Sequence, residues 1–448
     1  MSLSQALNKP PAETSPLLPL SSFGGAKGIR YASGVMLLIN NITGPGIPAL
    51  PNLLAEAGWL SPLLCMLGVW GMTTLAASML AEAMQHIPGN EGFEGRAEYS
   101  SVVRAFYAKA WAVGVQVGLI GALQSINLVS VLQSAQIMDS AIAAIFGRSC
   151  GINLTPYPSR TLRPPESAVV AETFSEIPGS ADFFSCVDVL RLEEGHPWGC
   201  HVVVSLGFVL TAAVTITCGR FNLDDNMAIQ RTSFFVTFGC WLMWLAACFC
   251  AMGSRIGDGS AGEMLGGTSL PPVNSEKRGG SQAAVLGTIL FNFGFVTTVP
   301  SWINEKHARV SVNASLWAAS SLSALVMLSV GLAGAVAFRQ VLQGSESNPS
   351  FGCASDLMQA LIQPQTSPFT QPVPRSLLHL SVYLFPIVSV VSSIPVFSIV
   401  IKYNLLEKGF SQRFSFAWSV LFPWAVGLPL LYMPNIVAQV TALFAPPH

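Results

Sequence analysis

Glycine and proline gather in one short stretch, residues 43–51, inside an apolar run long enough to span a membrane (residues 31–54). Gly44, Gly46 and Pro48 disfavour an unbroken helix there, because glycine favours other backbone conformations and proline removes a hydrogen-bond donor. In hydrocarbon, unpaired backbone groups are tolerated only where they are buried in protein or line a wet cavity. The stretch therefore predicts a helix that unwinds near the middle of a membrane, beside a cavity.

The chemistry open to such a break is the binding of a small charged molecule. A second half-helix starting at about Gly46 would point free N–H groups and the positive end of its dipole into the cavity, which suits a carboxylate. The alternative is a simple bend, since glycine and proline are common in membrane helices. Two glycines and three prolines within eight residues favour unwinding.

A related pattern recurs in the second half of the chain. When Pro300 is aligned with Pro51, Glu305 falls on Glu56, and Gly294 lies in an interrupted middle of the later segment. Interrupted helices at corresponding positions of two halves are typical of transporters built from inverted repeats, with the substrate held between the two breaks. The sequence therefore predicts that the two segments meet.

The composition indicates that the elements around these segments lie in a membrane. Hydrophobic residues make up 51% of the 448 residues and charged residues only 10%, which excludes a soluble enzyme of ordinary composition. Apolar runs, counted against the roughly 20 residues that a bilayer requires, give nine spans and part of a tenth. Lys and Arg are scattered, so no nucleic-acid partner is expected, and they favour the side of the N-terminus, which predicts a cytoplasmic N-terminus.

Residues 1–29 are predicted to form a disordered cytosolic tail. Glu13 lies four positions before the pair Leu17 and Leu18, a pattern that resembles the acidic dileucine signal read by vesicle-coat adaptors. If an adaptor binds it, the protein resides in a vacuolar or endolysosomal membrane; the plasma membrane is the alternative.

The interrupted segments also carry a family resemblance. The first segment reads Asn41-x-x-Gly44-Pro45-Gly46-Ile47-x-Ala49-Leu50-Pro51 and is followed by Glu56-Ala57-Gly58-Trp59. It resembles the first-helix signature of the amino acid/auxin permease family, which is Asn-x-x-Gly-x-Gly-Ile-Leu-x-Leu-Pro with a later Ala-Gly-Trp. The sixth apolar span, Phe291-x-Phe293 with Pro300 and Glu305, resembles that family's sixth helix. The family is part of the amino acid-polyamine-organocation superfamily.

The resemblance implies an all-α polytopic membrane protein with a leucine-transporter-like fold, in which five helices are repeated in inverted orientation and helices one and six are broken. The transmembrane amino acid transporter domain would cover residues 30–448, with a first repeat at about 30–253 and a second, incomplete repeat at about 282–448. Because the family normally has eleven spans, the C-terminal helices are expected to be truncated in this sequence.

In such folds the unwound parts of helices one and six hold the carboxylate and ammonium of the substrate. Carried over residue by residue, the resemblance assigns substrate binding to Thr43, Gly44, Gly46, Ile47, Phe291, Asn292, Phe293 and Gly294. The ammonium would suit the carbonyl end of the first half of helix six, where the helix dipole is negative. Pro48 stands where the family usually has leucine. Because proline has no N–H, the expected carboxylate site has one donor fewer.

The coupling ion is expected to be a proton or sodium, with no other cofactor. Ser392 and Ser393 match the place where sodium-coupled members add hydroxyls, although serine is equally a packing residue between helices. Asp139 and Glu82 are acids in predicted spans that either carry protons or reach the headgroups. Glu56 and Glu305 are caps or gate partners. The dispersed histidines and cysteines predict no metal site.

These observations predict a secondary active transporter that moves amino acids by alternating access, coupled to a proton or sodium gradient. Apolar residues around both breaks favour a small neutral amino acid. The alternative is an amino-acid sensor, a permease-like receptor with little flux. An enzyme is not expected, because no nucleophile with its base and no pair of acids meets at one depth.

Overall fold

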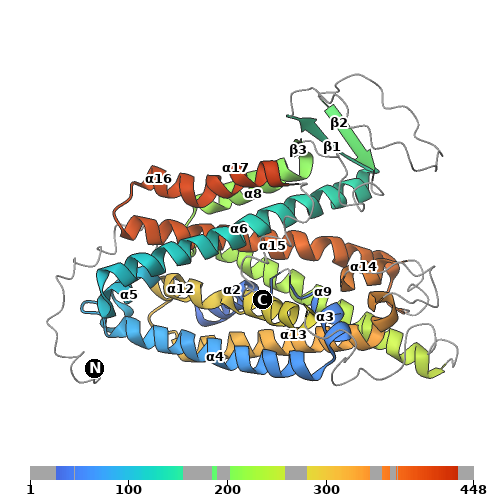
Figure 1. The fold of residues 1–448 in the computed structure, drawn as a ribbon, viewed down its shortest axis with the longest axis horizontal. Helices are drawn as coiled ribbons and strands as arrows, with labels where there is room; N and C mark the ends of the chain where they lie inside the picture. Colours follow the sequence, from blue (N-terminus) through green and yellow to red (C-terminus); the bar gives the residue numbers. More distant parts are fainter. Residues whose placement is uncertain are drawn as a thin grey trace.

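The structure is a computed structural model and describes residues 27–44, 46–154, 184–188, 202–257, 280–343, 356–363, 370 and 372–431. The predicted sorting residues Glu13, Leu17 and Leu18 lie outside these described residues. Within them, six helices are long and apolar enough to cross a membrane. The helices form an elongated bundle (Figure 1).

The predicted spans of the first half all contain helix within the described residues. They form α2 (Tyr31–Ile42), α3 (Leu50–Ala57), α4 (Leu60–Gln85), α6 (Lys109–Phe146), α8 (Leu206–Arg220) and α9 (Met227–Gly257). The short elements η2 (Glu91–Phe93) and α5 (Tyr99–Phe106) join α4 to α6. The fourth span begins at Leu206, later than its apolar run, because the residues just before it form a strand and Ser205 caps the helix by accepting from the Phe208 N–H at 3.2 Å.

The second half continues the same pattern. Its elements are α11 (Gly280–Asn292), η3 (Gly294–Thr298), α12 (Val299–Glu305), α13 (Val312–Gln343), α14 (Leu357–Ile362), α15 (Arg375–Glu407), α16 (Gln412–Phe416), η5 (Ala417–Leu421) and α17 (Phe422–Leu430). The ninth predicted span is therefore three consecutive pieces, α16, the π-helical η5 and α17, and proline stands in the first turn of α17.

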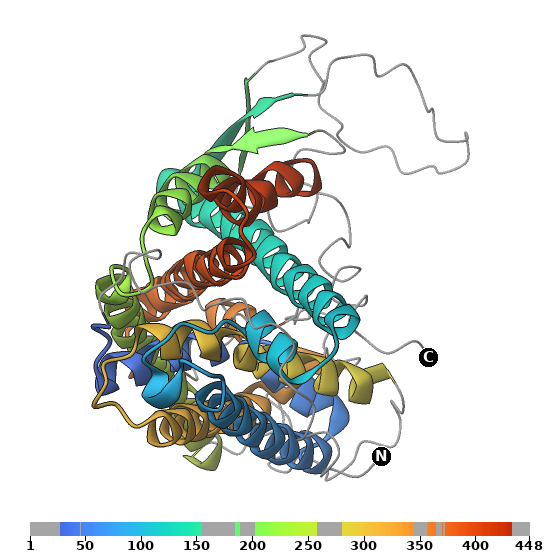
Figure 2. The same cartoon turned by 90° about the vertical axis from the view of Figure 1, so that its left-hand side faces the viewer.

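The helices divide into two groups. α13 packs against α2, α3, α4 and α9, whereas α15 packs against α6, α8 and α9. Figures 1 and 2 show α6, α8, α15 and α17 on one side of the bundle and α2, α4, α12 and α13 on the other. α9 contacts both groups, and the Trp244 indole on α9 donates to the Ser381 hydroxyl on α15 at 3.0 Å. Because the two helix groups share few elements, one group can rock against the other as a rigid body, as alternating access requires.

Both predicted helix breaks are present. Pro51 and Pro300 each stand in the first turn of the half-helix after a break, α3 and α12, where a missing N–H costs no intrahelical bond. The sequence alignment of Pro300 with Pro51 thus corresponds to equivalent structural positions.

The prediction that the second half-helix starts at about Gly46 is wrong: α3 begins at Leu50. Turn bonds precede it, from Ile47 N to Gly44 O at 3.4 Å and from Ala49 N to Gly46 O at 3.3 Å. The amides of Ile47 and Ala49 are therefore engaged, weakly, in the turns instead of being free for a ligand.

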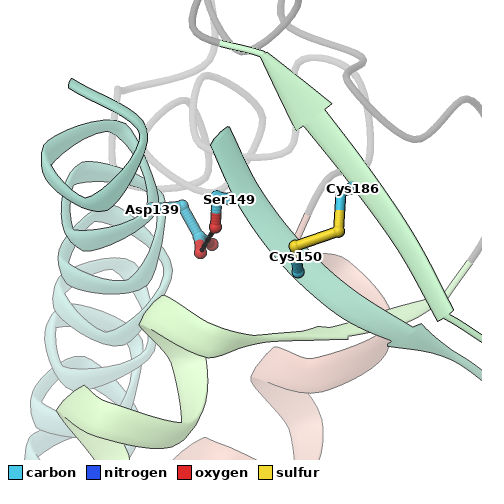
Figure 3. Close-up of a disulfide and its surroundings, with 4 residues drawn as sticks. All are labelled: Asp139, Ser149, Cys150 and Cys186. Atoms are coloured by element: carbon cyan, nitrogen blue, oxygen red, sulfur yellow. Dashed lines mark hydrogen bonds between the residues drawn. A yellow bond between two sulfur atoms is a disulfide. The ribbon is translucent and has the colours of Figure 1, made fainter. Parts of the chain in front are cut away.

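A small antiparallel sheet lies at the end of the bundle opposite α5. It consists of β1 (Arg148–Asn153), β2 (Phe184–Asp188) and β3 (Val203–Ser205) in the order β2-β1-β3. Cys150 of β1 faces Cys186 of β2 in the strand register, and the two form a disulfide (Figure 3). A disulfide is typical of segments in an oxidising, non-cytoplasmic compartment.

Asp139 fixes this sheet to the bundle. Its carboxylate Oδ1 accepts from the Ser149 hydroxyl at 2.8 Å and from the Gly207 N–H at 2.9 Å (Figure 3). A Cβ at Gly207 would lie 2.6 Å from the Asp139 backbone nitrogen, so only glycine permits this approach of α8 to α6. The carboxylate therefore joins α6, β1 and the start of α8.

Replacing Asp139 with alanine should destabilise the protein. Both donors lose their acceptor in a buried place, at a cost of about 1–3 kcal/mol for each group. Thermal unfolding of the purified protein should show a lower melting temperature for Asp139→Ala. Ser140→Ala is the matched control, because the Ser140 hydroxyl donates to the Gln136 carbonyl of its own helix at 3.1 Å. Equal melting temperatures for the two variants would contradict the anchoring role.

Candidate functional site

The first break runs from Thr43 to Ala49, between α2 and α3. Thr43 ends α2 with its N–H and its hydroxyl both bonded to the Ile39 carbonyl, at 2.8 and 2.6 Å. The Thr43 carbonyl, left without a helical partner, accepts from the Ser389 hydroxyl of α15 at 3.4 Å. The first break is thus attached to the opposite helix group through a carbonyl at the negative end of α2.

The second break lies between α11 and α12. Phe293 N still bonds to the Ile289 carbonyl at 3.0 Å, after which the chain tightens into the 3-10 turn η3. The hydroxyls of Thr297 and Thr298 bond to carbonyls of that same turn, those of Gly294 at 3.0 Å and Phe295 at 2.8 Å. A 3-10 segment inside a span leaves carbonyls of the preceding α-helix without intrahelical partners.

Two asparagines bring the breaks together. The Asn41 amide of α2 donates to the Thr298 hydroxyl of η3 at 3.3 Å. The Asn292 side chain at the end of α11 lies against the first break, where a Cβ at Gly46 would overlap its amide nitrogen and lie 3.0 Å from its Oδ1. The interrupted segments thus meet, as the sequence predicts.

The same asparagines leave two acceptors open. Asn41 and Asn292 are buried, yet the Oδ1 atom of each has no hydrogen-bond partner among the described residues, while the Asn292 amide nitrogen donates to the Thr288 carbonyl at 2.8 Å. Buried acceptors are normally satisfied, and a ligand donor is one way to satisfy them. Two such oxygens beside unwound backbone suit an ammonium group.

The predicted substrate-binding residues all lie in or directly beside these breaks. Ile47 and Phe293 are fully buried and act as packing residues, whereas Gly44, Gly46, Phe291 and Gly294 are partly exposed. A Cβ at Gly294 would meet no atom within 4 Å, so open space lies beside η3. None of the eight predicted residues is ionisable, so the junction itself is electrically neutral.

The predicted coupling-ion serines lie on α15, facing α9. The Ser392 carbonyl accepts from the Gln230 amide at 2.8 Å, and the Ser392 hydroxyl donates to the Ser389 carbonyl at 3.0 Å and lies 2.9 Å from the Ser233 hydroxyl. Ser393 is buried one residue further on. Gln230 also accepts from the Asn40 amide at 3.0 Å, so one amide joins α2, α9 and α15.

The predicted acids do not gather at the junction. Asp139 lies at the sheet, Glu82 is exposed on α4, and Glu56 is partly buried near the end of α3. Glu305 is buried at the end of α12 nearest α5 and accepts from the Tyr403 hydroxyl at 2.5 Å and the Asp224 N–H at 2.7 Å. Glu305 thus helps to close that end of the bundle.

Sequence reasoning did not assign four residues of this arrangement: Asn41, Thr298, Gln230 and Ser233. Asn41 belongs to the quoted signature, and a polar side chain within an apolar span is the signal that identifies it. Gln230 and Ser233 carry the same signal on α9. Their partners on other helices, however, are 155 or more residues away in the chain, so only the structure identifies the pairs.

Comparisons with known proteins agree with this arrangement. Residues 27–158 match the family model described as transmembrane amino acid transporter protein, which confirms the resemblance found in the sequence. No curated protein matches the chain significantly. Matching solved structures include the crystal structure of MhsT in complex with L-phenylalanine, at 12% identity and a TM-score of 0.59, covering 92% of this chain and 85% of that chain. The fold is therefore leucine-transporter-like, and the protein is an integral multi-pass membrane protein.

Replacing Gly46 with alanine should weaken substrate binding. The new Cβ would displace the Asn292 amide from the Thr288 carbonyl and move its Oδ1, which removes a bond to a charged group worth about 1.5–3 kcal/mol. Amino acids should stabilise the natural protein against heat, and the Gly46→Ala variant should need at least about tenfold more ligand for the same shift.

Gly287→Ala is the matched control for this variant. Gly287 lies on an exposed face of α11, and a Cβ there meets no atom within 4 Å. Equal ligand concentrations for both variants and the natural protein would show that the Gly46–Asn292 contact plays no part in binding.

Proposed function

We propose that the protein is a secondary active transporter that moves amino acids, small and neutral ones, across a membrane by alternating access around the two helix breaks, driven by a proton or sodium gradient. The observation that carries the proposal is the meeting of the breaks at Asn41 and Asn292, with two buried amide oxygens left open beside unwound backbone.

The junction offers both signs of charge that an amino acid needs. α2 and α11 end there, and the ends of helices carry free carbonyls and a negative partial charge, which suits an ammonium. α3 and α12 begin there, and the starts of helices carry a positive partial charge, which suits a carboxylate. Because no side chain at the junction is ionised, the best substrate is one whose own charges cancel.

Alternating access requires that one end of the site closes while the other opens. At the α5 end, which is predicted to be cytoplasmic, Ile29 N donates to the Glu305 carbonyl at 3.2 Å and His307 N donates to the Ile29 carbonyl at 2.8 Å. The backbone at Ile29 therefore lies across the end of α12. These few bonds support a closure that breaks and reforms during transport.

The membrane of residence is proposed from the sequence alone. The pattern Glu13 with Leu17 and Leu18 supports delivery to a vacuolar or endolysosomal membrane by a vesicle-coat adaptor, with the plasma membrane as the destination if the tail is not read.

Uptake into liposomes tests the proposal. The purified protein should accumulate labelled amino acids from a mixture under an inward proton gradient or an inward sodium gradient. A tenfold ion gradient supports about tenfold accumulation at one ion per substrate. Protein-free liposomes under the same gradients give the background.

The result that contradicts transport is saturable binding of an amino acid without uptake under either gradient. That result would favour the sensor, which requires the same binding site but no flux. Neither binding nor uptake of any amino acid would contradict both functions.

A further inference from the structure

Three acids meet at the α5 end of the bundle, away from the helix breaks; Glu98 and Glu305 are buried and Glu407 is partly buried. Glu98 lies in the segment before α5, Glu305 ends α12, and Glu407 ends α15. All three belong to elements that must separate if the predicted cytoplasmic end opens. The cluster is therefore placed to sense that motion.

Glu98 holds the other elements together. Its Oε2 accepts from the Ser301 hydroxyl at 2.6 Å and its Oε1 accepts from the Asn304 amide at 2.8 Å, both on α12. The Asn404 amide of α15 donates to Glu98 Oε2 at 3.4 Å. One carboxyl group thus joins the second half of the broken helix to α15.

Glu407 and Glu305 surround Glu98 with like charge. Glu407 accepts from the backbone N–H of Glu98 and from the Ser100 hydroxyl, each at 3.3 Å, and from the Ser101 hydroxyl. Glu305 is bonded to Tyr403, whose hydroxyl also interacts electrostatically with Glu98. These donors hold the acids in place.

The cations at this end lie close to the acids. Arg96 is buried two residues before Glu98 and interacts with Glu305. Lys402 of α15 donates to the carbonyls of Gly219 and Phe221 at 3.1 Å, and Lys408 interacts with Glu407 and Arg104. The buried carboxyl groups of Glu98 and Glu305 share one desolvated region, which favours a neutral form of one of them.

A buried amide that contacts Glu98 has an oxygen without a hydrogen-bond donor among the described residues. Asn404 has no exposed surface, and its amide nitrogen donates to Glu98 and, at 2.9 Å, to the Val400 carbonyl. Its Oδ1 has no hydrogen-bond partner among the described residues. A carboxylate only accepts hydrogen bonds, whereas a protonated carboxyl group also donates one. A proton on Glu98 would therefore add a donor where acceptors are in excess.

Electrostatics agree with this geometry. Burial, followed by repulsion from Glu407, raises the pKa of the Glu98 carboxyl from 4.5 to about 8. Protonation of Glu98 therefore favours the closed arrangement in which its pKa is raised. This contribution to stability is fully present below pH 4.5 and is lost as the pH rises through about 8. The closed α5 end is thus favoured by a proton over most of the physiological range.

The serine site is a poorer place for a coupling ion. The Ser392 carbonyl and hydroxyl are already bonded to Gln230, Ser389 and Ser233, so a sodium ion there would have to displace existing bonds. A proton on Glu98 displaces nothing, because the Ser301 hydroxyl at 2.6 Å can turn from donor to acceptor.

We propose that the coupling ion is a proton and that Glu98 binds it while the α5 end is closed. The proposal rests on the transport function proposed above and identifies its coupling residue. When α12 separates from α15, water reaches Glu98, the carboxylate becomes stable, and the proton leaves to that side of the membrane. The proton thus binds more tightly to the closed state, which is the differential affinity that coupling requires.

Glu98→Gln tests this coupling, with Glu94→Gln as the matched control. Glutamine keeps the size of the side chain and resembles the protonated acid, whereas Glu94 is exposed on the same segment. In liposomes the natural protein and Glu94→Gln should accumulate substrate about tenfold for each unit of inward pH gradient. Glu98→Gln should still exchange internal for external substrate but lose the response to the gradient. Retained proton-driven accumulation, or accumulation by the natural protein under sodium alone, would overturn the proposal.

Infrared spectroscopy tests the proton site without any transport. The natural protein and Glu94→Gln should show a protonated carboxyl band that disappears between about pH 7 and about pH 9, and Glu98→Gln should lack it. If the band is present but no amino acid is transported, the proposed function fails while the proton site stands. If the natural protein has no such band, the proton site is refuted whatever the transport assay shows.

Discussion

Every backbone N–H and carbonyl within a bilayer must find a partner inside the protein, and this requirement governs the structure. A single interrupted helix would leave unpaired groups in hydrocarbon. Here two interruptions lie against each other, with Asn41 reaching Thr298 and Asn292 lying against Gly46. Turns satisfy part of the exposed backbone, and what is left unpaired faces a shared site. The need to pair these backbone groups destabilises a single broken membrane helix, but where two breaks meet it favours the binding of a polar ligand.

The same requirement explains where the charged and titratable side chains lie along the bundle. The junction of the breaks has no ionisable side chain among its predicted residues, so helix ends and amides provide its polarity. Buried acidic side chains lie instead toward the two ends of the bundle. Asp139 holds the sheet at one end through Ser149 and Gly207, and Glu98 joins α12 to α15 at the other. A neutral centre favours a zwitterion, and charged ends are free to respond to ions and to the opening of the site.

Features that depend on residues close together in the chain could be predicted from the sequence. Glycine and proline near residues 44–51 predicted the first break, and the Pro300 alignment located its counterpart, because these effects act within a few residues. The exact start of α3 was missed, since turn bonds engage Ile47 and Ala49. The Glu98 cluster could not be found, because its partners are 203 or more residues away. The roles predicted for Ser392, Ser393 and Asp139 in coupling remain predictions.

Thiol labelling of Gly294→Cys tests most directly that the junction of the breaks is the substrate site. A side chain at this position meets no atom within 4 Å, so the variant should fold and carry its thiol beside Asn292. A small water-soluble thiol reagent should label the variant faster than the natural protein, whose own cysteines give the background rate. The account predicts that the amino acid taken up or bound by the protein slows this labelling, in proportion to its occupancy. Labelling at an unchanged rate under saturating amino acid would contradict it.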